Sequence, residues 1–200
     1  MKTVLVSQRV DVLPDRGERR DALDQRLLDW LAASDLLPVP VPNNLERLAA
    51  LWEHLRPCAV ILSGGNDLVN YGGDAPERDA VERALLARAL AEQIPLFALC
   101  RGAQLVLDAF GIPLERVTGH VGNRHQVSIN GRTFSVNSYH QWGCRELRAP
   151  LQVLARSDDG VVEAFTHEHL PIMGIMWHPE REMPFAELDK TLLAQCLNKE

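Results

Sequence analysis

Residues 94–104 read IPLFALCRGAQ, and this stretch decides the fold. Its first six residues, 94–99, are apolar, which is typical of a strand buried on both faces of a parallel sheet. The residues from Arg101 to Phe110 then predict a helix, which Gly111 ends. Cys100 therefore lies in the tight turn between a buried strand and a helix.

Cys100 has the surroundings of a nucleophile. In such a turn the sulfur points outward, and the positive end of the helix dipole stabilises a thiolate. The small residues Ala98 and Gly102 stand two positions before and after it, which is the spacing of a nucleophile elbow with cysteine in place of serine. A lone cysteine is more often a buried structural residue, so the elbow spacing is what favours a catalytic role.

Strands and helices alternate on both sides of this stretch. Short apolar runs predict strands at 3–7, 36–41 and 59–62, and helical spacing of apolar residues predicts helices at 18–33, 45–55 and 76–93. This alternation indicates a doubly wound, mostly parallel α/β sheet flanked by helices.

The second half adds antiparallel hairpins. One is predicted at 127–136 around Asn130-Gly131, and another joins 151–156 to 161–166. A strand at 171–177 and a helix at 185–197 close the chain. No repeat or linker interrupts residues 1–200, so a single domain is expected.

The composition excludes several classes of function. The 200 residues carry a net charge of −6, which argues against broad binding to nucleic acid or to membrane surfaces. The N-terminal apolar run is too short for a signal peptide, and no stretch approaches a membrane span. The four cysteines show no C-x-x-C spacing, so neither disulfides nor a zinc site are expected, and a reducing cytoplasm fits. We predict no metal and no cofactor.

A cysteine nucleophile needs a base, and the base needs an orienting acceptor. His178 follows the predicted strand at 171–177, at the sheet edge where ligand-facing residues lie. Glu180 follows after a rigid proline and is placed to orient the imidazole. Three further histidines are expected to be solvated: His54, His167 and His169.

The tetrahedral intermediate of acyl transfer needs an oxyanion hole. Gly64 and Gly65 end the strand expected beside that of Cys100, and glycines there can turn a backbone N–H inward. We expect the N–H groups of Gly65 and Arg101 to be the two donors. An ordinary strand-to-loop turn is the alternative for the two glycines.

Five motifs in order resemble class I glutamine amidotransferases and the related γ-glutamyl hydrolases of the peptidase C26 type. The motifs are Ser63-Gly64-Gly65, Cys100 to Gln104, Asn137 to Gln141, Asp159 to Ala164 and Trp177 to Glu180. The resemblance covers most of the chain and implies a glutamine amidotransferase-like, flavodoxin-like fold. Ala98 departs from the glycine that the family usually has, which implies a slightly less free elbow.

The resemblance implies a thioester mechanism on a small-molecule γ-glutamyl amide. Cys100 attacks the carbonyl, His178 protonates the leaving amine, and water releases glutamate. The expected residues for substrate binding are Gly64, Asn66, Gln104, Asn137, Ser138, Tyr139 and His140.

Arg9 and the segments 17–24, 63–68 and 176–182 resemble more particularly a bacterial group of γ-glutamyl hydrolases. That group acts on γ-glutamyl-CDP-amidate and releases cytidine diphosphoramidate for surface polysaccharide modification. Residues 119–125 also resemble this group. Their Gly, Arg and His residues could contact a diphosphate, and a polar lid loop is the alternative. The candidates for the diphosphate are Arg124, His120 and His125, with Arg19 and Arg20 behind them.

Two other functions stay open at this stage. One is a glutaminase subunit that passes ammonia to a synthase, and the other is a non-catalytic binding module on the same fold. The intact Cys100, His178 and Glu180 argue against the binding module. A homodimer or a synthase partner is compatible with the sequence.

Overall fold

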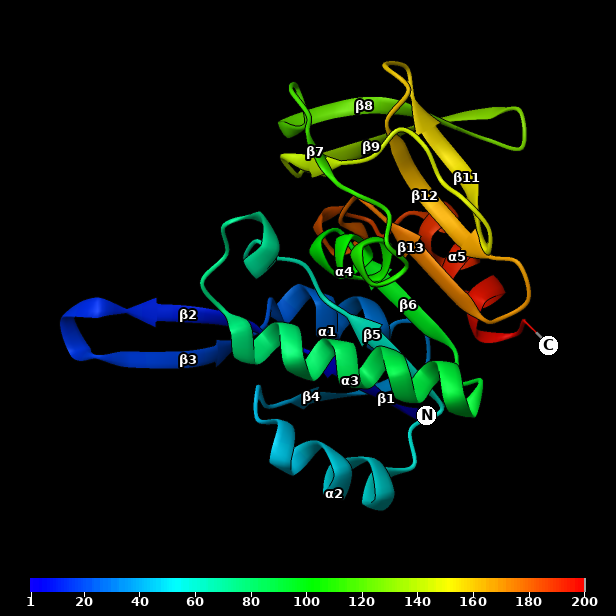
Figure 1. Ribbon diagram of the computed structural model, residues 1–200. Coiled ribbons are helices and arrows are strands. Elements are labelled where there is room, and N and C mark those ends of the chain that lie inside the picture. The colour runs from blue at the N-terminus through cyan, green and yellow to red at the C-terminus, as the bar shows by residue number, and fades with distance from the viewer. Residues whose placement is uncertain (200) are drawn as a thin grey trace.

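A nine-stranded mixed sheet forms the centre of the computed structural model, which describes residues 1–199 (Figure 1). One half of the sheet is parallel and confirms the predicted doubly wound α/β class. Its strands lie in the order β4 (Leu36–Val41), β1 (Lys2–Ser7), β5 (Ala59–Leu62), β6 (Leu96–Leu99) and β13 (Ile172–Ile175).

The other half of the sheet is antiparallel and contains the two predicted hairpins. It continues from β13 with β12 (Val162–His167), β11 (Leu151–Ser157), β8 (Val121–Ile129) and β9 (Arg132–Tyr139). Asn130 and Gly131 both have positive φ, 50° and 74°, as a two-residue hairpin turn requires. Residues from 121 onward belong to β8, so most of the segment interpreted as a lid loop is strand.

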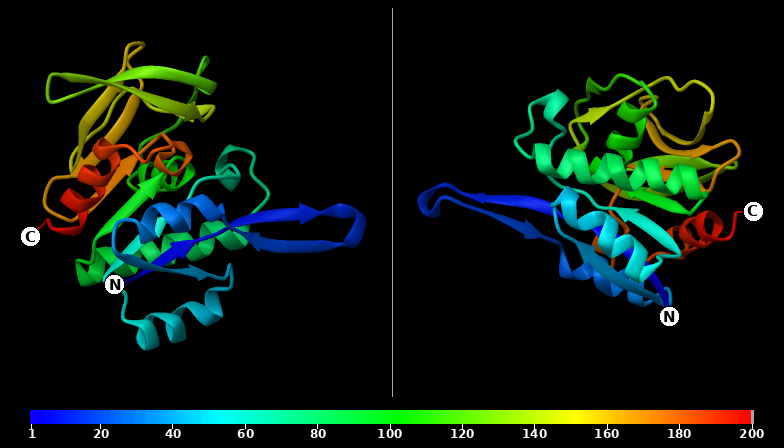
Figure 2. Two further views of the ribbon diagram at one scale, coloured as in Figure 1. Left: turned by 180° about the vertical axis from the view of Figure 1, so that it is seen from behind. Right: turned by 60° about the horizontal axis from the view of Figure 1, so that its bottom comes forward.

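Helices cover both faces of the parallel half, as Figure 2 shows from behind and from below. Alternate strand residues point to opposite faces. Leu5, Leu62 and Ala98 therefore belong to one buried cluster with three helices, and Val6 and Phe97 belong to a second cluster with the other two. The first set is α2 (Leu45–Leu55), α3 (Pro76–Glu92) and α4 (Arg101–Ala109), and the second is α1 (Gln25–Ala32) and α5 (Glu187–Leu197).

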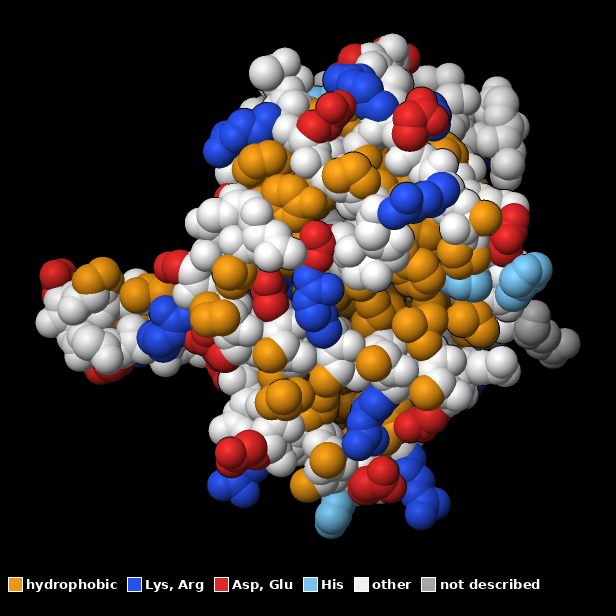
Figure 3. Space-filling model, viewed as in Figure 1, with side chains coloured by type: hydrophobic (Ala, Val, Ile, Leu, Met, Phe, Trp, Pro, Cys, Tyr) orange, Lys and Arg blue, Asp and Glu red, His pale blue; other side chains and the backbone are white. Residues whose placement is uncertain are grey.

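The single helix predicted at 18–33 is wrong in its first part. Residues 18–22 form β3 (Glu18–Ala22), which pairs with β2 (Arg9–Leu13) in a hairpin that projects from the body as an arm with both acidic and basic side chains (Figure 3). Gly17 turns the arm with a φ of 62°. The helix begins only after Asp24, whose carboxylate caps it by accepting from the N–H of Arg26.

Short elements complete the chain. A two-stranded pair joins the segments before and after the β8–β9 hairpin, and three single-turn helices lie in loops. The pair is β7 (Glu115–Arg116) with β10 (Trp142–Gly143), and the turns are η1 (Pro14–Arg16), η2 (Val69–Tyr71) and η3 (Pro179–Arg181). Among residues 1–199, no helix is long and apolar enough to cross a bilayer.

Candidate active site

Cys100 has the backbone conformation of a nucleophile elbow. Its φ of 47° and ψ of −105° are strained for a residue with a side chain, and its N–H donates to the carbonyl of Ile175 at 2.8 Å. Gly102 is required two positions on, because a Cβ there would lie 2.5 Å from the carbonyl oxygen of Leu62. Ala98 is fully buried and paired with Gly174, so the sheet accommodates its methyl group without opening the elbow.

His178 and Glu180 form the predicted pair. The imidazole Nδ1 lies 2.7 Å from Glu180 Oε1, and both side chains are buried. The turn η3 brings Glu180 back against the ring, so Nε2 is directed away from the carboxylate. Burial lowers the pKa of His178, but the charge and hydrogen bond of Cys100 and the contact with Glu180 outweigh it and raise the pKa to about 9.

Asn137, which was predicted to bind substrate, hydrogen-bonds to the backbone of His178. Its amide oxygen accepts from the N–H of His178 at 3.0 Å, and its Nδ2 donates to the carbonyl of His178 at 2.8 Å. The side chain thus fixes the backbone of His178 from β9. Nδ2 also donates to Glu182 at 2.8 Å, which uses both amide hydrogens.

Gly64 and Gly65 are shaped by the residues around them. A Cβ on Gly64 would lie 2.6 Å from His178 Cε1, so the imidazole rests against bare backbone. Gly65 has a φ of 84° and borders the same cleft as Cys100 and Arg101. Arg101 is the first residue of α4, where the backbone N–H has no acceptor within the helix. The two expected oxyanion donors therefore border one cleft beside Cys100.

A buried ionic network under these glycines was missed by sequence reasoning. Arg78 is fully buried and donates to the carbonyl oxygens of Ser63 at 2.7 Å and Gly64 at 3.1 Å, and also to that of Gly65. Glu82, also fully buried, pairs with Arg78 at 2.9 Å and with the guanidinium of Arg101. One carboxylate thereby joins the glycine turn to the first residue after Cys100. The pair at i and i+4 on α3 was the only sequence signal for it.

Glu82→Gln is expected to destabilise the protein by about 3 kcal/mol, because it leaves two buried guanidinium groups without their shared counter-ion. Urea unfolding followed by circular dichroism measures this change. Glu53→Gln is the matched control, since Glu53 is 73% exposed in a loose pair with Arg88 and its loss should cost within about 0.5 kcal/mol. Equal stability of the two variants would contradict a structural role of the network.

The cleft at Cys100 has a volume of about 440 Å³ and contains much of the predicted substrate set. Gln104 donates to the carbonyl of Trp142 at 2.9 Å. Tyr139 meets the ring of His178 edge-on at 5.8 Å, and the guanidinium of Arg181 lies 4.2 Å from the tyrosine ring. The cleft is lined by Gly65, Asn66, Asp67, Cys100, Arg101, Gln104, Val121, Tyr139, His140, Gln141, His178 and Arg181.

Two other predicted substrate residues have their polar groups directed at backbone. Asn66 borders the cleft, but its amide accepts from the N–H of Val10 at 2.8 Å and donates to the Val10 carbonyl at 2.9 Å. It thereby anchors the base of the β2–β3 arm. Ser138 is fully buried and donates to the carbonyl of His120 at 2.7 Å.

None of the predicted diphosphate residues lines the cleft at Cys100. Arg124 lies half-exposed on β8, where it pairs with Glu182 at 2.7 Å and donates to the carbonyl of Ser135 at 2.9 Å. His120 and His125 are turned toward Glu163. Arg19 pairs with Glu77 and Arg20 with Glu18, out on the arm.

Of the three histidines expected in solvent, one is buried. His167 is 6% exposed, because its Nδ1 accepts from the backbone N–H groups of His169 and Leu170 at 3.1 Å and closes the turn after β12. His54 and His169 are exposed as expected.

A second cleft of about 250 Å³ also borders His178. It shares Gly65, His178 and Arg181 with the first cleft, and Arg9 of the arm borders it. The two clefts therefore meet at His178.

The family model for peptidase C26 matches residues 11–180. The chain belongs to the peptidase C26 family. A γ-glutamyl-CDP-amidate hydrolase of Campylobacter jejuni is 36% identical over 88% of this chain and 89% of its own length. A γ-glutamyl-γ-aminobutyrate hydrolase of Escherichia coli O157:H7 is 31% identical over 82% and 81%. A solved glutamine amidotransferase from Thermotoga maritima superimposes with a TM-score of 0.67 at 14% identity, over 97% of this chain and 82% of the other.

Membership of the peptidase C26 family makes the protein a hydrolase of amide bonds. The likeness to the Thermotoga protein confirms the glutamine amidotransferase-like fold that the five motifs implied. Both results agree with the elbow at Cys100 and with the imidazole beside it.

Proposed function

We propose that this protein is a cysteine-dependent γ-glutamyl hydrolase that releases glutamate through a thioester. The observation that carries this proposal is the strained elbow at Cys100, in one cleft with His178, whose Nδ1 lies 2.7 Å from Glu180 Oε1. Relatives that act on γ-glutamyl amides support the acyl half of the substrate.

The geometry supports the following sequence of steps. The Cys100 thiolate attacks the γ-carbonyl carbon, and the oxygen takes the negative charge near the N–H groups of Gly65 and Arg101. The C–N bond then breaks as His178 gives its proton to the leaving amine. His178, now neutral, takes a proton from water, which attacks the thioester and releases glutamate and the thiolate. Glu180 holds the ring orientation and stabilises the imidazolium.

Glu180→Gln is expected to shift the alkaline limb of the kcat/KM profile to lower pH. The protonated imidazole is the form that can protonate the leaving amine, so activity falls as pH rises through the His178 pKa of about 9. Removing the carboxylate charge lowers that pKa, and the limb moves with it. Glutamate release measured between pH 6 and pH 10 tests this. An alkaline limb in the same place for both proteins would contradict the role of Glu180.

The leaving group that the structure supports best is a phosphorylated amine, and we propose γ-glutamyl-CDP-amidate as the substrate. The Campylobacter relative is named as a hydrolase of this compound. Arg9 and Arg181 border the second cleft beside His178; Arg181 also lines the first cleft, and Arg9 pairs with Asp11 at 2.8 Å. One guanidinium group can bind two phosphate oxygens at once. We therefore expect Arg9 and Arg181, in place of Arg124, His120 and His125, to bind the diphosphate.

Arg9→Ala is expected to lower kcat/KM for γ-glutamyl-CDP-amidate by about 10- to 100-fold, the effect of one charge-assisted bond to phosphate. Hydrolysis of a small uncharged γ-glutamyl amide should change by less than about 2-fold, because the acyl cleft is untouched. Arg124→Ala is the matched control, since Arg124 borders neither cleft and its guanidinium pairs with Glu182. Equal loss on both substrates would mean that Arg9 only supports the arm.

A direct assay tests the function itself. The purified protein is given γ-glutamyl-CDP-amidate, γ-glutamyl-γ-aminobutyrate and glutamine, and glutamate is measured together with the ³¹P spectrum of the phosphorylated product. The proposal requires the highest kcat/KM for the CDP compound and the appearance of cytidine diphosphoramidate. Glutamine as the best substrate would favour a glutaminase subunit instead.

A further inference from the structure

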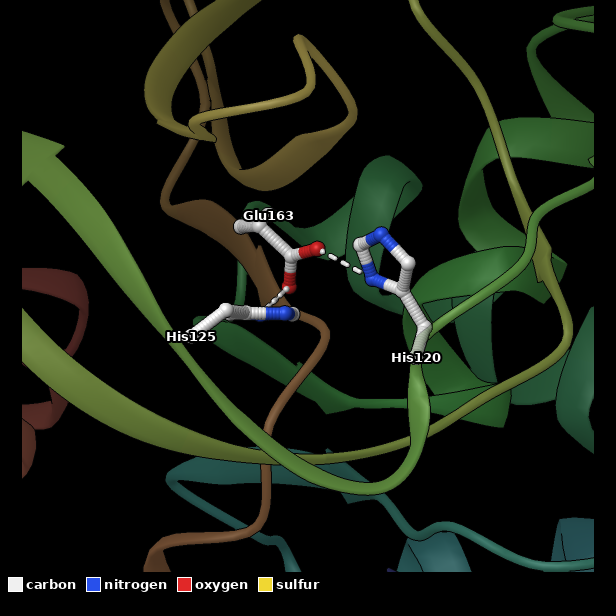
Figure 4. A group of neighbouring side chains, drawn as sticks. All are labelled: His120, His125 and Glu163. Atoms are coloured by element: carbon white, nitrogen blue, oxygen red, sulfur yellow. Dashed lines mark ion pairs between the residues drawn. The ribbon is translucent and has the colours of Figure 1, made fainter.

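Four side chains with metal-binding atoms converge behind the first cleft. His120 immediately precedes β8 and His125 lies on it, while His140 follows β9 and Glu163 lies on β12. His120, His140 and Glu163 are almost fully buried, with exposed fractions of 3%, 2% and 0%. Figure 4 shows the Glu163 carboxylate between the rings of His120 and His125, one oxygen directed at each.

The outer nitrogens of two of these rings have acceptors. His120 Nε2 lies 3.2 Å from an Asp159 carboxylate oxygen, and His140 Nδ1 lies 3.1 Å from the carbonyl of Trp142. Each of these nitrogens therefore carries a proton, and in the neutral ring the other nitrogen presents a lone pair. The lone pairs of His120 Nδ1 and His140 Nε2 face each other at 3.3 Å, beside a buried carboxylate.

Such an arrangement favours a positive charge at its centre. Glu163 meets the three imidazoles at ion-pair distance, yet neither of its oxygens nor His125 Nε2 makes a well-directed hydrogen bond, although all three atoms are buried. A single proton shared between the rings of His120 and His140 gives none of these three atoms a hydrogen bond. Leaving a buried carboxylate without hydrogen bonds has a high free-energy cost.

The separations of His120 and His140 from one Glu163 oxygen, and of His125 from the other, are close to the edge length of a metal tetrahedron. Glu163 Oε1 lies 3.1 Å from His120 Nδ1 and 3.4 Å from His140 Nε2, and Oε2 lies 3.3 Å from His125 Nε2. Metal–ligand bonds of about 2.0–2.1 Å in tetrahedral geometry give edges of about 3.3–3.4 Å. The ligand atoms of His120, His125 and Glu163 all lie within 4.8 Å of one another.

We propose that His120, His125, His140 and Glu163 bind a divalent transition metal ion of the zinc class. Three imidazoles and one carboxylate suit Zn²⁺, and four protein ligands make a closed site of structural type. Asp159 on His120 and the Trp142 carbonyl on His140 are the outer acceptors that orient metal-bound imidazoles. The metal would tie the β8–β9 hairpin to β12 and, through His140, hold the wall of the catalytic cleft.

The absence of a metal was predicted from the spacing of the cysteines, and this site contains no cysteine. Its ligands come from four separate points of the chain, between residues 120 and 163, so no short motif marks them. The pairing of β8 with β9 and β11, and of β11 with β12, brings them together.

Titration with metal tests the site. The Cys100→Ser variant is used as the background, which removes the thiolate beside His178 as a competing ligand. After treatment with EDTA it is titrated with CoCl₂, followed by visible absorption, and with ZnCl₂, followed by calorimetry. We expect one equivalent to bind, an absorption spectrum of tetrahedral cobalt, and a higher Tm in the presence of Zn²⁺.

Substitutions then locate the site. His125→Gln and Glu163→Gln should each weaken binding by about 100-fold or more, and Asp159→Asn by about 10- to 100-fold. His54→Gln, at an exposed histidine, should bind as the background does. Far-UV circular dichroism of the metal-free variants checks folding, and His125→Gln is the decisive variant if Glu163→Gln fails to fold, because His125 is partly exposed. Absence of saturable binding, or one-equivalent binding that survives His125→Gln, would overturn the proposal.

Discussion

Cys100→Ser is expected to lower kcat/KM for glutamate release by about 10⁴-fold or more while the fold stays intact. Removing one member of a nucleophile–base–orienter set costs this much in comparable hydrolases. Serine keeps the size and the strained backbone of the elbow, but its hydroxyl is a much weaker nucleophile than a thiolate. Steady-state release of glutamate from the best γ-glutamyl substrate measures the loss, and urea unfolding checks that stability is retained.

Cys58→Ser is the control for this experiment. Cys58 lies at the opposite end of β5 from the glycine turn and is partly exposed, so its substitution should leave kcat/KM unchanged within about 2-fold. Wild-type rates in Cys100→Ser would remove Cys100 from the mechanism, and a similar loss in both variants would indicate a general effect on folding.

His178→Ala should lower kcat/KM by about 10⁴-fold as well, because it removes the group that protonates the leaving amine. The loss should be larger than that of Glu180→Gln, which leaves a proton-transfer group in place with a poorer orientation. The same assay measures both variants. The thioester is still expected to form slowly with an activated substrate, and mass spectrometry of the intact protein would detect the added γ-glutamyl group.

His140 is the competing candidate for the base, since it borders the same cleft. Its ring is held by Trp142, His120 and Glu163, and it has no carboxylate partner at the 2.7 Å that Glu180 makes with His178. Near-normal activity in His178→Ala together with a 10⁴-fold loss in His140→Ala would reverse the assignment.

Local patterns predicted the parallel half of the fold well. The apolar runs at 36–41 and 59–62 are β4 and β5 with these bounds, and the helix predicted at 76–93 is α3 with Gln93 as its left-handed cap. Buried strands and capped helices have local signals, because their residues must match the period of the element. The arm at 9–22 was missed because its charged β3 has no apolar alternation, and Leu23 extended the helical pattern backward past Asp24.

The amino-acid sequence by itself determined the elbow, the pair of His178 with Glu180 and the family, because each is carried by short motifs of neighbouring residues. Only the tertiary structure decided which polar groups remain directed at the cleft. Asn137 and Ser138 were expected to bind substrate, yet in β9 both hydrogen-bond to backbone groups. The network of Arg78, Glu82 and Arg101 and the histidine cluster around Glu163 form where separate strands and helices meet. Tertiary packing, more than spacing along the chain, brings these buried charges into contact.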